Sequence, residues 1–229
     1  MKVFAISDLH LSSACNKPMD IFGSSWEGYW EKIKADWAVK VGDDDLVLLC
    51  GDLSWGMSLE EAKPDLDQLA YLKGTKVIIK GNHDYWWSSL SKVKSIIDSS
   101  VLCLQNDCVR VGRALVCGSR LWALSGADKD DKIINREYLR LQLSLEKMEE
   151  MRQEGDWVVA MCHYPPFDVN MKENDFTRLL SEHNVDAVVY GHLHGKDCRA
   201  VKCVEIDSIP YYLSSCDLVD NNLVLLKEL

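Results

Sequence analysis

The sequence predicts an α/β fold with two β-sheets. In the first half, short apolar runs alternate with helical segments, a pattern typical of βαβ units. Later, a series of short strand-like runs predicts a second sheet that is more antiparallel. The composition, 47% hydrophobic and 27% charged, is ordinary for a globular protein, and 229 residues suit a single domain spanning 1–229.

Short apolar runs predict the strands. Three of them alternate with helices early in the chain, at 3–7, 46–50 and 76–80. The next three are separated by turns and are expected to be antiparallel, at 101–104, 108–110 and 113–117. Two buried strands and three short C-terminal strands follow, at 157–162, 187–190, 203–206, 211–213 and 223–226.

Apolar residues three or four positions apart predict the helices, at 26–39, 58–72, 85–97, 136–152 and 173–183. Ser58 and Glu61 form a candidate capping box for the second helix. The helix at 136–152 is amphipathic, and we expect Leu139, Leu143 and Met151 on its buried face. With the charged loop before it, this helix forms an elaboration around 128–155 that either caps the cleft or packs on a sheet.

The charge of the chain narrows the choice of partners. The formal net charge is −10 and the sequence pI is about 5.1. Proteins that bind nucleic-acid backbones are normally basic, so a nucleic-acid partner is disfavoured. A phosphorylated substrate remains compatible, because bound divalent cations reverse the local charge.

Cysteine usage and hydropathy predict a cytoplasmic protein. The nine cysteines include no Cys-x-x-Cys pair, and several lie in apolar strand-like runs, as expected for reduced core residues. The N-terminal apolar run is too short for the core of a signal peptide, and no run is long enough to cross a bilayer. We therefore expect no membrane association.

Five predicted strands end in side chains that can bind a metal ion. They are Asp8 and His10, Asp52, Asn82 and His83, His163, and His192 and His194. Five of the six histidines lie at these ends, and only His183 lies elsewhere, late in a predicted helix. Open α/β sheets place their chemistry at strand ends, so these side chains are expected to share one crevice.

The spacing and chemistry of these residues predict a metal site. Residues i and i+2 of an extended chain point the same way, so Asp8 can reach the same ion as His10, and His192 the same cleft as His194. Imidazole, carboxylate and amide donors suit Mn, Fe or Zn. The set exceeds what one tetrahedral ion needs and fits two divalent ions about 3.5–4 Å apart. Asp52, alone on its strand end, is the natural bridging carboxylate.

In order and spacing these motifs resemble the calcineurin-like metallophosphoesterase superfamily. The resemblance covers 8–194 and rests on Asp8-Leu9-His10, Gly51-Asp52, Gly81-Asn82-His83-Asp84, His163 and Gly191-His192-Leu193-His194. It implies a two-sheet β-sandwich of mixed strands flanked by helices. It also implies ligand sets: the first metal is held by Asp8, His10 and His194, Asp52 bridges, and the second metal is held by Asn82, His163 and His192.

The resemblance assigns a different task to His83, which would protonate the leaving group without binding a metal. Its partner is unassigned, although Asp84 is adjacent. The second motif lacks the Asp-Arg-Gly ending of the protein Ser/Thr phosphatase branch, so the chain resembles bacterial predicted phosphohydrolases instead. Arg120 is a candidate phosphate contact, and an ordinary surface arginine is an equal alternative.

The function implied by the resemblance is a metal-dependent phosphoester hydrolase. Two divalent ions would activate water for attack on a phosphomonoester or phosphodiester of a small phosphorylated substrate. The alternatives are a nuclease of the same superfamily, which the acidic charge disfavours, and a non-catalytic scaffold, which would be expected to have lost ligands. Tryptophans close to the motifs, such as Trp26 and Trp55, either stack on a substrate ring or pack between helices and sheet.

Overall fold

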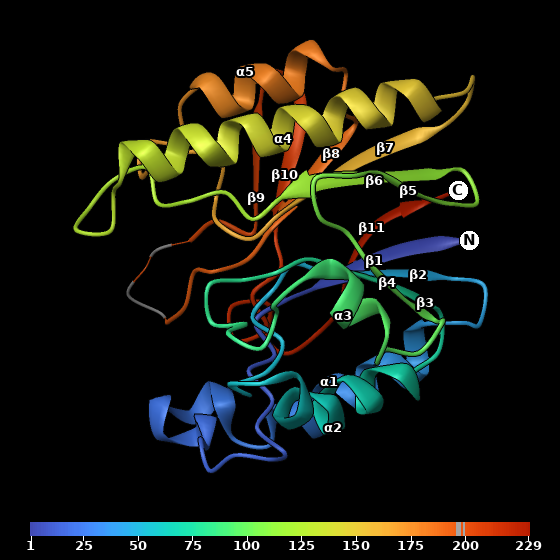
Figure 1. Ribbon diagram of the computed structural model, residues 1–229, viewed down its shortest axis with the longest axis vertical. Coiled ribbons are helices and arrows are strands. Elements are labelled where there is room, and N and C mark those ends of the chain that lie inside the picture. The colour runs from blue at the N-terminus through green and yellow to red at the C-terminus, as the bar shows by residue number, and fades with distance from the viewer. Residues whose placement is uncertain (196–197, 199) are drawn as a thin grey trace.

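The computed structural model describes residues 1–195, 198 and 200–229, and shows two stacked β-sheets with helices on both outer faces (Figure 1). This arrangement confirms the predicted fold class. Helices α4 (Asp131–Met151) and α5 (Asp175–Glu182) lie over one sheet. Helices α1 (Tyr29–Lys40) and α2 (Leu59–Ala70) lie over the other, and α3 (Leu90–Lys94) is a single short helix.

The first sheet has the strand order β11-β1-β2-β3-β4. Its strands are β1 (Lys2–Ile6), β2 (Leu46–Leu49), β3 (Thr75–Ile78), β4 (Val101–Cys103) and β11 (Val224–Glu228). Strands β1 to β4 are parallel, and β11 pairs antiparallel with β1. The expectation that the strand at 101–104 is antiparallel was wrong. The chain crosses over through α3 after β3, and a crossover connection returns it parallel.

The second sheet has the strand order β5-β6-β7-β8-β10-β9. Its strands are β5 (Val109–Val111), β6 (Ala114–Ser119), β7 (Trp157–Cys162), β8 (Ala187–Tyr190), β9 (Cys203–Ile206) and β10 (Ile209–Leu213). The predicted antiparallel character holds only at the two edges, where β5 and β9 pair with their neighbours. The four central strands are parallel, because α4 and α5 provide crossovers after β6 and β7.

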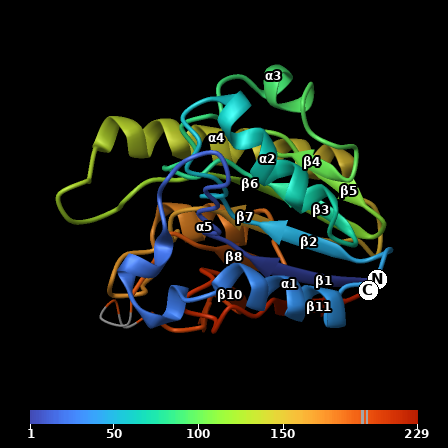
Figure 2. The same ribbon diagram turned by 90° about the horizontal axis from the view of Figure 1, so that it is seen from below.

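Side-chain alternation along β1 shows how the core is layered. Phe4 and Ile6 face the helical layer, where they join a cluster with Ile33 and Trp37 of α1. Val3 and its neighbours of the same parity face the second sheet and form the apolar layer between the sheets. A third cluster joins the second sheet to α4 and α5, which are seen above that sheet in Figure 1 and from another side in Figure 2.

The buried face of α4 differs from the predicted one. Leu141, Leu145 and Met148 are buried, whereas Leu139 and Leu143 are 51% and 54% exposed. The buried face also carries polar residues. The Ser144 hydroxyl accepts the Gly118 N–H and donates to the Asp107 carbonyl, and Glu137 is fully buried. Leucines therefore occupy two faces of α4. The face that packs on the second sheet also carries polar residues, so hydrophobic periodicity alone does not identify it. The helix lies on the second sheet.

Two predicted helices are shorter than expected. The helix at 85–97 is reduced to α3, which begins after the N-cap Ser89, and the preceding residues form a loop that buries Trp86 and Trp87. The first helix begins at Tyr29, after a left-handed Gly28. Ser58 caps α2 as predicted by accepting the Glu61 N–H, but the Glu61 carboxylate accepts from Met57 N–H, so a strict capping box is not formed.

Within the part of the chain that the structure describes, no helix is both long enough and apolar enough to cross a membrane. The nine cysteines, all described, are free, and those predicted in strands (Cys50, Cys103, Cys117 and Cys162) are buried.

Candidate metal centre

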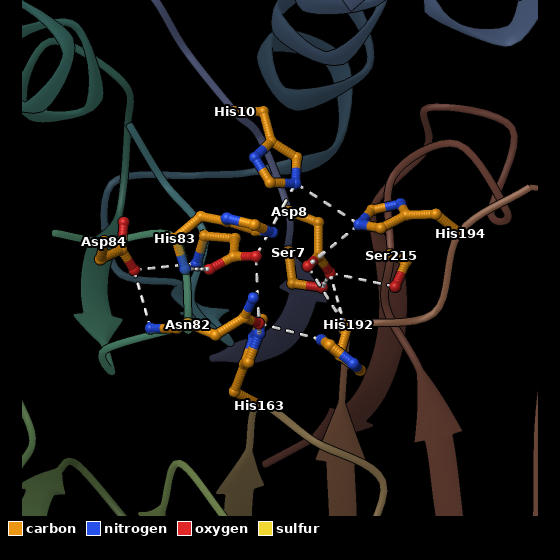
Figure 3. Close-up of polar contacts among 12 residues, drawn as sticks. Ser7, Asp8, His10, Asn82, His83, Asp84, His163, His192, His194 and Ser215 are labelled. Carbon is orange, nitrogen blue, oxygen red and sulfur yellow. Dashed lines mark hydrogen bonds and ion pairs between the residues drawn. The ribbon is translucent and has the colours of Figure 1, made fainter. Parts of the chain in front are cut away.

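The predicted ligands from five strand ends meet at one edge of the two sheets (Figure 3). They follow β1, β2, β3, β7 and β8, which are parallel strands whose carboxyl ends lie on the same side. The structure brings together all seven predicted ligands and His83: Asp8, His10, Asp52, Asn82, His83, His163, His192 and His194.

The first group of donor atoms comes from Asp8, His10 and His194. The Nε2 atoms of His10 and His194 lie 3.4 Å apart, and His194 Nε2 lies 3.4 Å from Asp8 Oδ1. One donor atom from each of the three residues falls within 4.8 Å of the other two. This is the set that the resemblance assigns to the first metal.

The second group converges on the side-chain oxygen of Asn82. His163 Nε2 lies 2.6 Å and His192 Nδ1 3.0 Å from Asn82 Oδ1. The other ring nitrogen of His163, Nδ1, is 2.8 Å from the Cys50 carbonyl oxygen. A carbonyl only accepts, so Nδ1 carries the proton and the Nε2 lone pair faces the Asn82 oxygen.

Asp52 lies between the two groups. Its Oδ2 atom is 3.8 Å from His10 Nε2 and 3.5 Å from His163 Nε2, while Oδ1 accepts the His83 N–H at 2.8 Å. Asp8 also belongs to both groups, since it clusters with Asp52 and His163 as well. Asp52 and Asp8 are therefore both positioned to bridge ions that the two groups would hold.

The donor set fits divalent metal ions. The His163 nitrogen and the Asn82 oxygen are both acceptors, and they face each other at hydrogen-bond distance without a proton to share. A cation between them satisfies both. Nitrogen donors combined with carboxylate and amide oxygens suit a borderline metal such as Mn, Fe or Zn.

Burial holds three of the histidines neutral and ready to bind. It lowers the pKa of His10 to about 3 and that of His163 to about 4. The pKa of His192 is lowered to about 3 by burial and by the neighbouring His163. All three rings are therefore uncharged at neutral pH and offer a free lone pair.

His194 and Asp8 are the charged side chains of the first group, and they form an ion pair. Burial alone would lower the pKa of His194, but the Asp8 and Asp217 carboxylates raise it to about 10. Burial would likewise raise the pKa of Asp8, and His194 reverses that and lowers it. Burial, with the charges of Asp84 and Asp8, raises the pKa of Asp52 well above its ordinary value. Metal binding therefore displaces protons from this site.

Asp217 and Ser215 support the site and were missed by the sequence reasoning. Asp217 Oδ1 accepts from His194 Nδ1 at 2.8 Å, which leaves His194 Nε2 facing the first group. The Ser215 hydroxyl donates to Asp8 at 3.0 Å. A signal was available, because both residues follow the predicted strand at 211–213, and the strand-end rule used for the other ligands also applies there.

The backbone is constrained around the ligands. Asp8, His10, Asp52 and His192 all have positive φ angles, which non-glycine residues seldom adopt outside functional sites. A β-carbon on Gly81 would lie 2.1 Å from Asp52 Oδ1, so glycine is required for this close approach. The loops are thus held in the one arrangement that brings the ligands together.

Asp84 holds the second and third motifs to each other and does not bind the His83 ring. Its carboxylate accepts backbone N–H groups from Gly81, Asp52 and Leu53 at 2.7–2.8 Å, and also the indole N–H of Trp86. His83 Nδ1 is buried and has no hydrogen-bond partner among the described residues. The ring of His83 instead lies beside Trp55 and His10, with centroids 4.8 and 5.6 Å away.

Aromatic side chains enclose one flank of the first group. Trp55 stacks on the His10 ring at 4.8 Å, and Trp26 packs edge-on against the same ring at 6.0 Å. Trp86 and Trp87 are buried, which agrees with packing between helices and sheet. Beside the second group, the ring centroids of Tyr164 and His192 lie 3.9 Å apart, and both residues line a cavity of about 510 Å³.

The side chain of Arg120, the candidate phosphate contact, contacts residues outside the two donor groups. Its guanidinium lies 3.4 Å from the buried Glu137 carboxylate and over the Trp122 ring. Its carbonyl accepts the N–H groups of His163 and Tyr164, so the residue neighbours the site through its backbone.

Comparison with solved structures shows the same fold at low sequence identity. A protein from Thermus thermophilus aligns with a TM-score of 0.61 and 12% identity, over 98% of this chain and 97% of that one. The phosphopantetheinyl hydrolase of Mycobacterium tuberculosis aligns with a TM-score of 0.58 and 14% identity, over 98% and 95%. A protein of unknown function from Aquifex aeolicus gives 0.51 and 14%, also over 98% and 95%.

Sequence comparison identifies the family. An uncharacterised protein of Methanocaldococcus jannaschii is 35% identical over 88 residues, which is 36% of this chain and 47% of that relative, so the match spans about half of its length. The profile of the family described as Calcineurin-like phosphoesterase matches residues 1–196, where all the predicted ligands lie. The chain therefore belongs to the calcineurin-like phosphoesterase family.

Proposed function

We propose that the protein hydrolyses a phosphoester of a small phosphorylated molecule with two divalent metal ions bound. The observation that carries this proposal is the pair of donor groups, one around His10 and His194 and one around Asn82, with Asp52 between them. A scaffold without catalytic function has no need for this set, or for a further carboxylate, Asp217, that orients His194.

The residues divide into metal holders and a proton donor. Asp8, His10 and His194 would hold one ion, Asn82, His163 and His192 would hold the other, and Asp52 would bridge. When bound, the ions would lower the pKa of a coordinated water and neutralise charge on the phosphoryl group. Mn, Fe and Zn all suit these donors.

His83 is the residue best placed to move a proton. Its ring lies within the cluster, and its Nδ1 atom has no hydrogen-bond partner among the described residues. Burial lowers its pKa, while the nearby negative charge of a bound phosphoester favours the protonated ring. The protonated imidazole would then donate to the departing alkoxide. The cavity beside His192 and Tyr164 offers room for a leaving group of moderate size.

The test is hydrolysis of generic esters by purified protein loaded with manganese. We expect turnover of p-nitrophenyl phosphate or its bis ester, and comparing the two distinguishes a monoesterase from a diesterase. Fe, Zn, Co and Ni are screened in parallel, and Asp52→Asn serves as the inactive control. Absence of turnover with every metal, at confirmed metal occupancy, would favour the scaffold alternative. Cleavage of oligonucleotides in preference to these esters would favour the nuclease.

A further inference from the structure

We propose that a small basic cavity beside the metal centre binds a second phosphate group of the substrate. This inference rests on the proposed function for its placement, and it specifies the class of substrate as a phosphoester that carries a further phosphate. The cavity is lined by the cations of Lys80, Arg120, Arg136 and Arg140, together with Glu137.

The cavity has an excess of positive charge. Among the described residues, Glu137 is its only acidic lining residue, and that carboxylate is fully buried. Four cations against one carboxylate leave a formal charge of +3, in a chain whose net charge is −10. Confined like charges of this kind repel one another, and an anion bound among them relieves the repulsion.

Glu137 holds the guanidinium groups in place without using up their donors. Its Oε1 atom accepts from Arg140 at 2.8 Å, from Arg136 at 3.2 Å and from Arg120 at 3.4 Å. Each guanidinium carries five N–H donors, so most donors remain for a ligand. Arg120 Nε is buried and has no hydrogen-bond partner among the described residues. One guanidinium is enough to form an ion pair with Glu137. A purely structural ion pair therefore does not explain why three guanidinium groups gather there.

The size and chemistry of the cavity suit a phosphate group. Its volume is about 280 Å³, just below the range of about 300–1,000 Å³ for pockets that hold larger ligands. Guanidinium groups bind phosphate oxygens through paired, charge-assisted hydrogen bonds. Lys80 adds a flexible ammonium group, whose Nζ atom donates to the Trp87 carbonyl at 2.9 Å and keeps further donors.

The cavity adjoins the segments that carry the second group of donors. Lys80 directly precedes Gly81-Asn82, and the Arg120 carbonyl accepts the N–H of His163. The Arg120 side chain lies over Trp122, and Trp122 contacts Tyr164, which packs on His192. A substrate whose reacting phosphate is held by the metal centre would therefore be able to place a second anionic group in this cavity.

The first experiment measures phosphate binding to the metal-free protein, where no metal ion is present to bind the phosphate. Calorimetry with inorganic phosphate is expected to show saturable binding by the wild type, and Arg140→Gln is expected to weaken it roughly tenfold or more. The matched control is Arg178→Gln, on α5, which removes an exposed arginine already paired with Glu173 and Asp175. It is expected to bind as the wild type does.

A second variant guards against misfolding of the first. Lys80→Gln leaves all three arginine partners of Glu137 intact and keeps a donor for the Trp87 carbonyl, and it too is expected to weaken phosphate binding. No saturable phosphate binding by the wild type, or equal weakening by Arg178→Gln, would overturn the proposal.

The second experiment tests whether the bound phosphate belongs to the substrate. With metal loaded, phosphate release from glucose 1,6-bisphosphate is compared with release from glucose 1-phosphate, a pair that differs by one phosphate. We expect a KM for the bisphosphate roughly tenfold lower or more, and we expect Arg140→Gln to remove most of that advantage. Equal KM values in the wild type would exclude a substrate phosphate. Hydrolysis of neither sugar, with the p-nitrophenyl esters also uncleaved, would contradict the proposed function alone, and the phosphate titration would still decide the cavity.

Discussion

Asp217 determines which nitrogen of His194 faces the first donor group, because its carboxylate accepts the Nδ1–H. Partners of this kind typically contribute 10–100-fold to metal affinity. We therefore expect Asp217→Ala to weaken Mn²⁺ binding by roughly this factor, measured by calorimetry. Asp220→Ala removes an exposed carboxylate paired with Lys202 and should leave the affinity unchanged. Equal affinities for the wild type and Asp217→Ala would show that the hydrogen bond has no role in orienting the ring.

The role of His83 can be distinguished from that of the neighbouring metal ligands by varying the leaving group of the substrate. The backbone N–H that it donates to Asp52 is retained in His83→Ala, so the variant should keep both metals. Removing a general acid typically lowers the rate about 10²–10⁴-fold. We expect a loss of that size on alkyl esters and a much smaller loss on p-nitrophenyl esters, whose phenolate leaves without help. Loss of a metal, or an equal rate loss for every leaving group, would make His83 a ligand or a substrate contact.

At the scale of elements, α4 offers a test of which leucines support the second sheet. Leu145 is fully buried, whereas Leu143, two residues earlier, is 54% exposed. Leu145→Ala should lower the free energy of unfolding by about 2–5 kcal/mol, through lost burial and the cavity left behind. Leu143→Ala should change it by about 0.5 kcal/mol or less. Denaturant unfolding of the two variants measures both, and a larger effect at Leu143 would restore the face that the periodicity predicts.

The elements also show what a sequence can and cannot predict. Strands β7 and β8 have the predicted boundaries, because a continuous apolar run between polar ends admits few other readings. Strand direction was predicted wrongly for the strand at 101–104 and for the centre of the second sheet, because direction depends on which segments cross over between strands. The face of α4 was misread because Glu137 and Ser144 are buried among its leucines.

The sequence predicts site residues that directly follow a predicted strand. It predicts less well a hydrogen-bond partner that comes from a distant segment. Asp8 and His10 stand together on one strand end. Asp217 also follows a predicted strand, but its pairing with His194 is seen only once the fold brings the two residues together. The basic cavity combines positions 80, 120, 136 and 140, which no local pattern connects.

For the whole molecule, the buried neutral histidines predict sensitivity to acid. Their ordinary pKa is 6.5, and burial lowers the pKa of His10 and His192 to about 3 and of His163 to about 4. Below pH 6.5 the unfolded chain therefore binds protons that the folded metal-free protein does not, so folding stability falls as pH falls from 6.5 to about 4.

Other groups of the site modify this trend. Burial raises the pKa values of Asp52 and Asp84, and both oppose the trend within the same window, but the three histidines outnumber them. The raised pKa of His194 acts only between pH 6.5 and about 10. Urea unfolding of metal-free protein at a series of pH values measures the trend. Constant or rising stability between pH 6.5 and 4 would show that the lowered pKa values of these rings do not dominate the acid response of the metal-free protein.

The contact between Asp8 and Ser215 has a consequence for biosynthesis. The two residues are 207 positions apart, so at a ribosomal rate of about 5–20 residues per second Ser215 is made roughly 10–40 s after Asp8. For most of that interval Asp8 and His10 are on a nascent chain that lacks their partner His194, which is made only 21 residues before Ser215. The site therefore cannot select its ions while the chain is being made. Selection begins only when both donor groups are complete in the folded protein. There, geometry and the supply of metals in the cell, rather than the affinity of a loose ligand pair, decide which ion is retained.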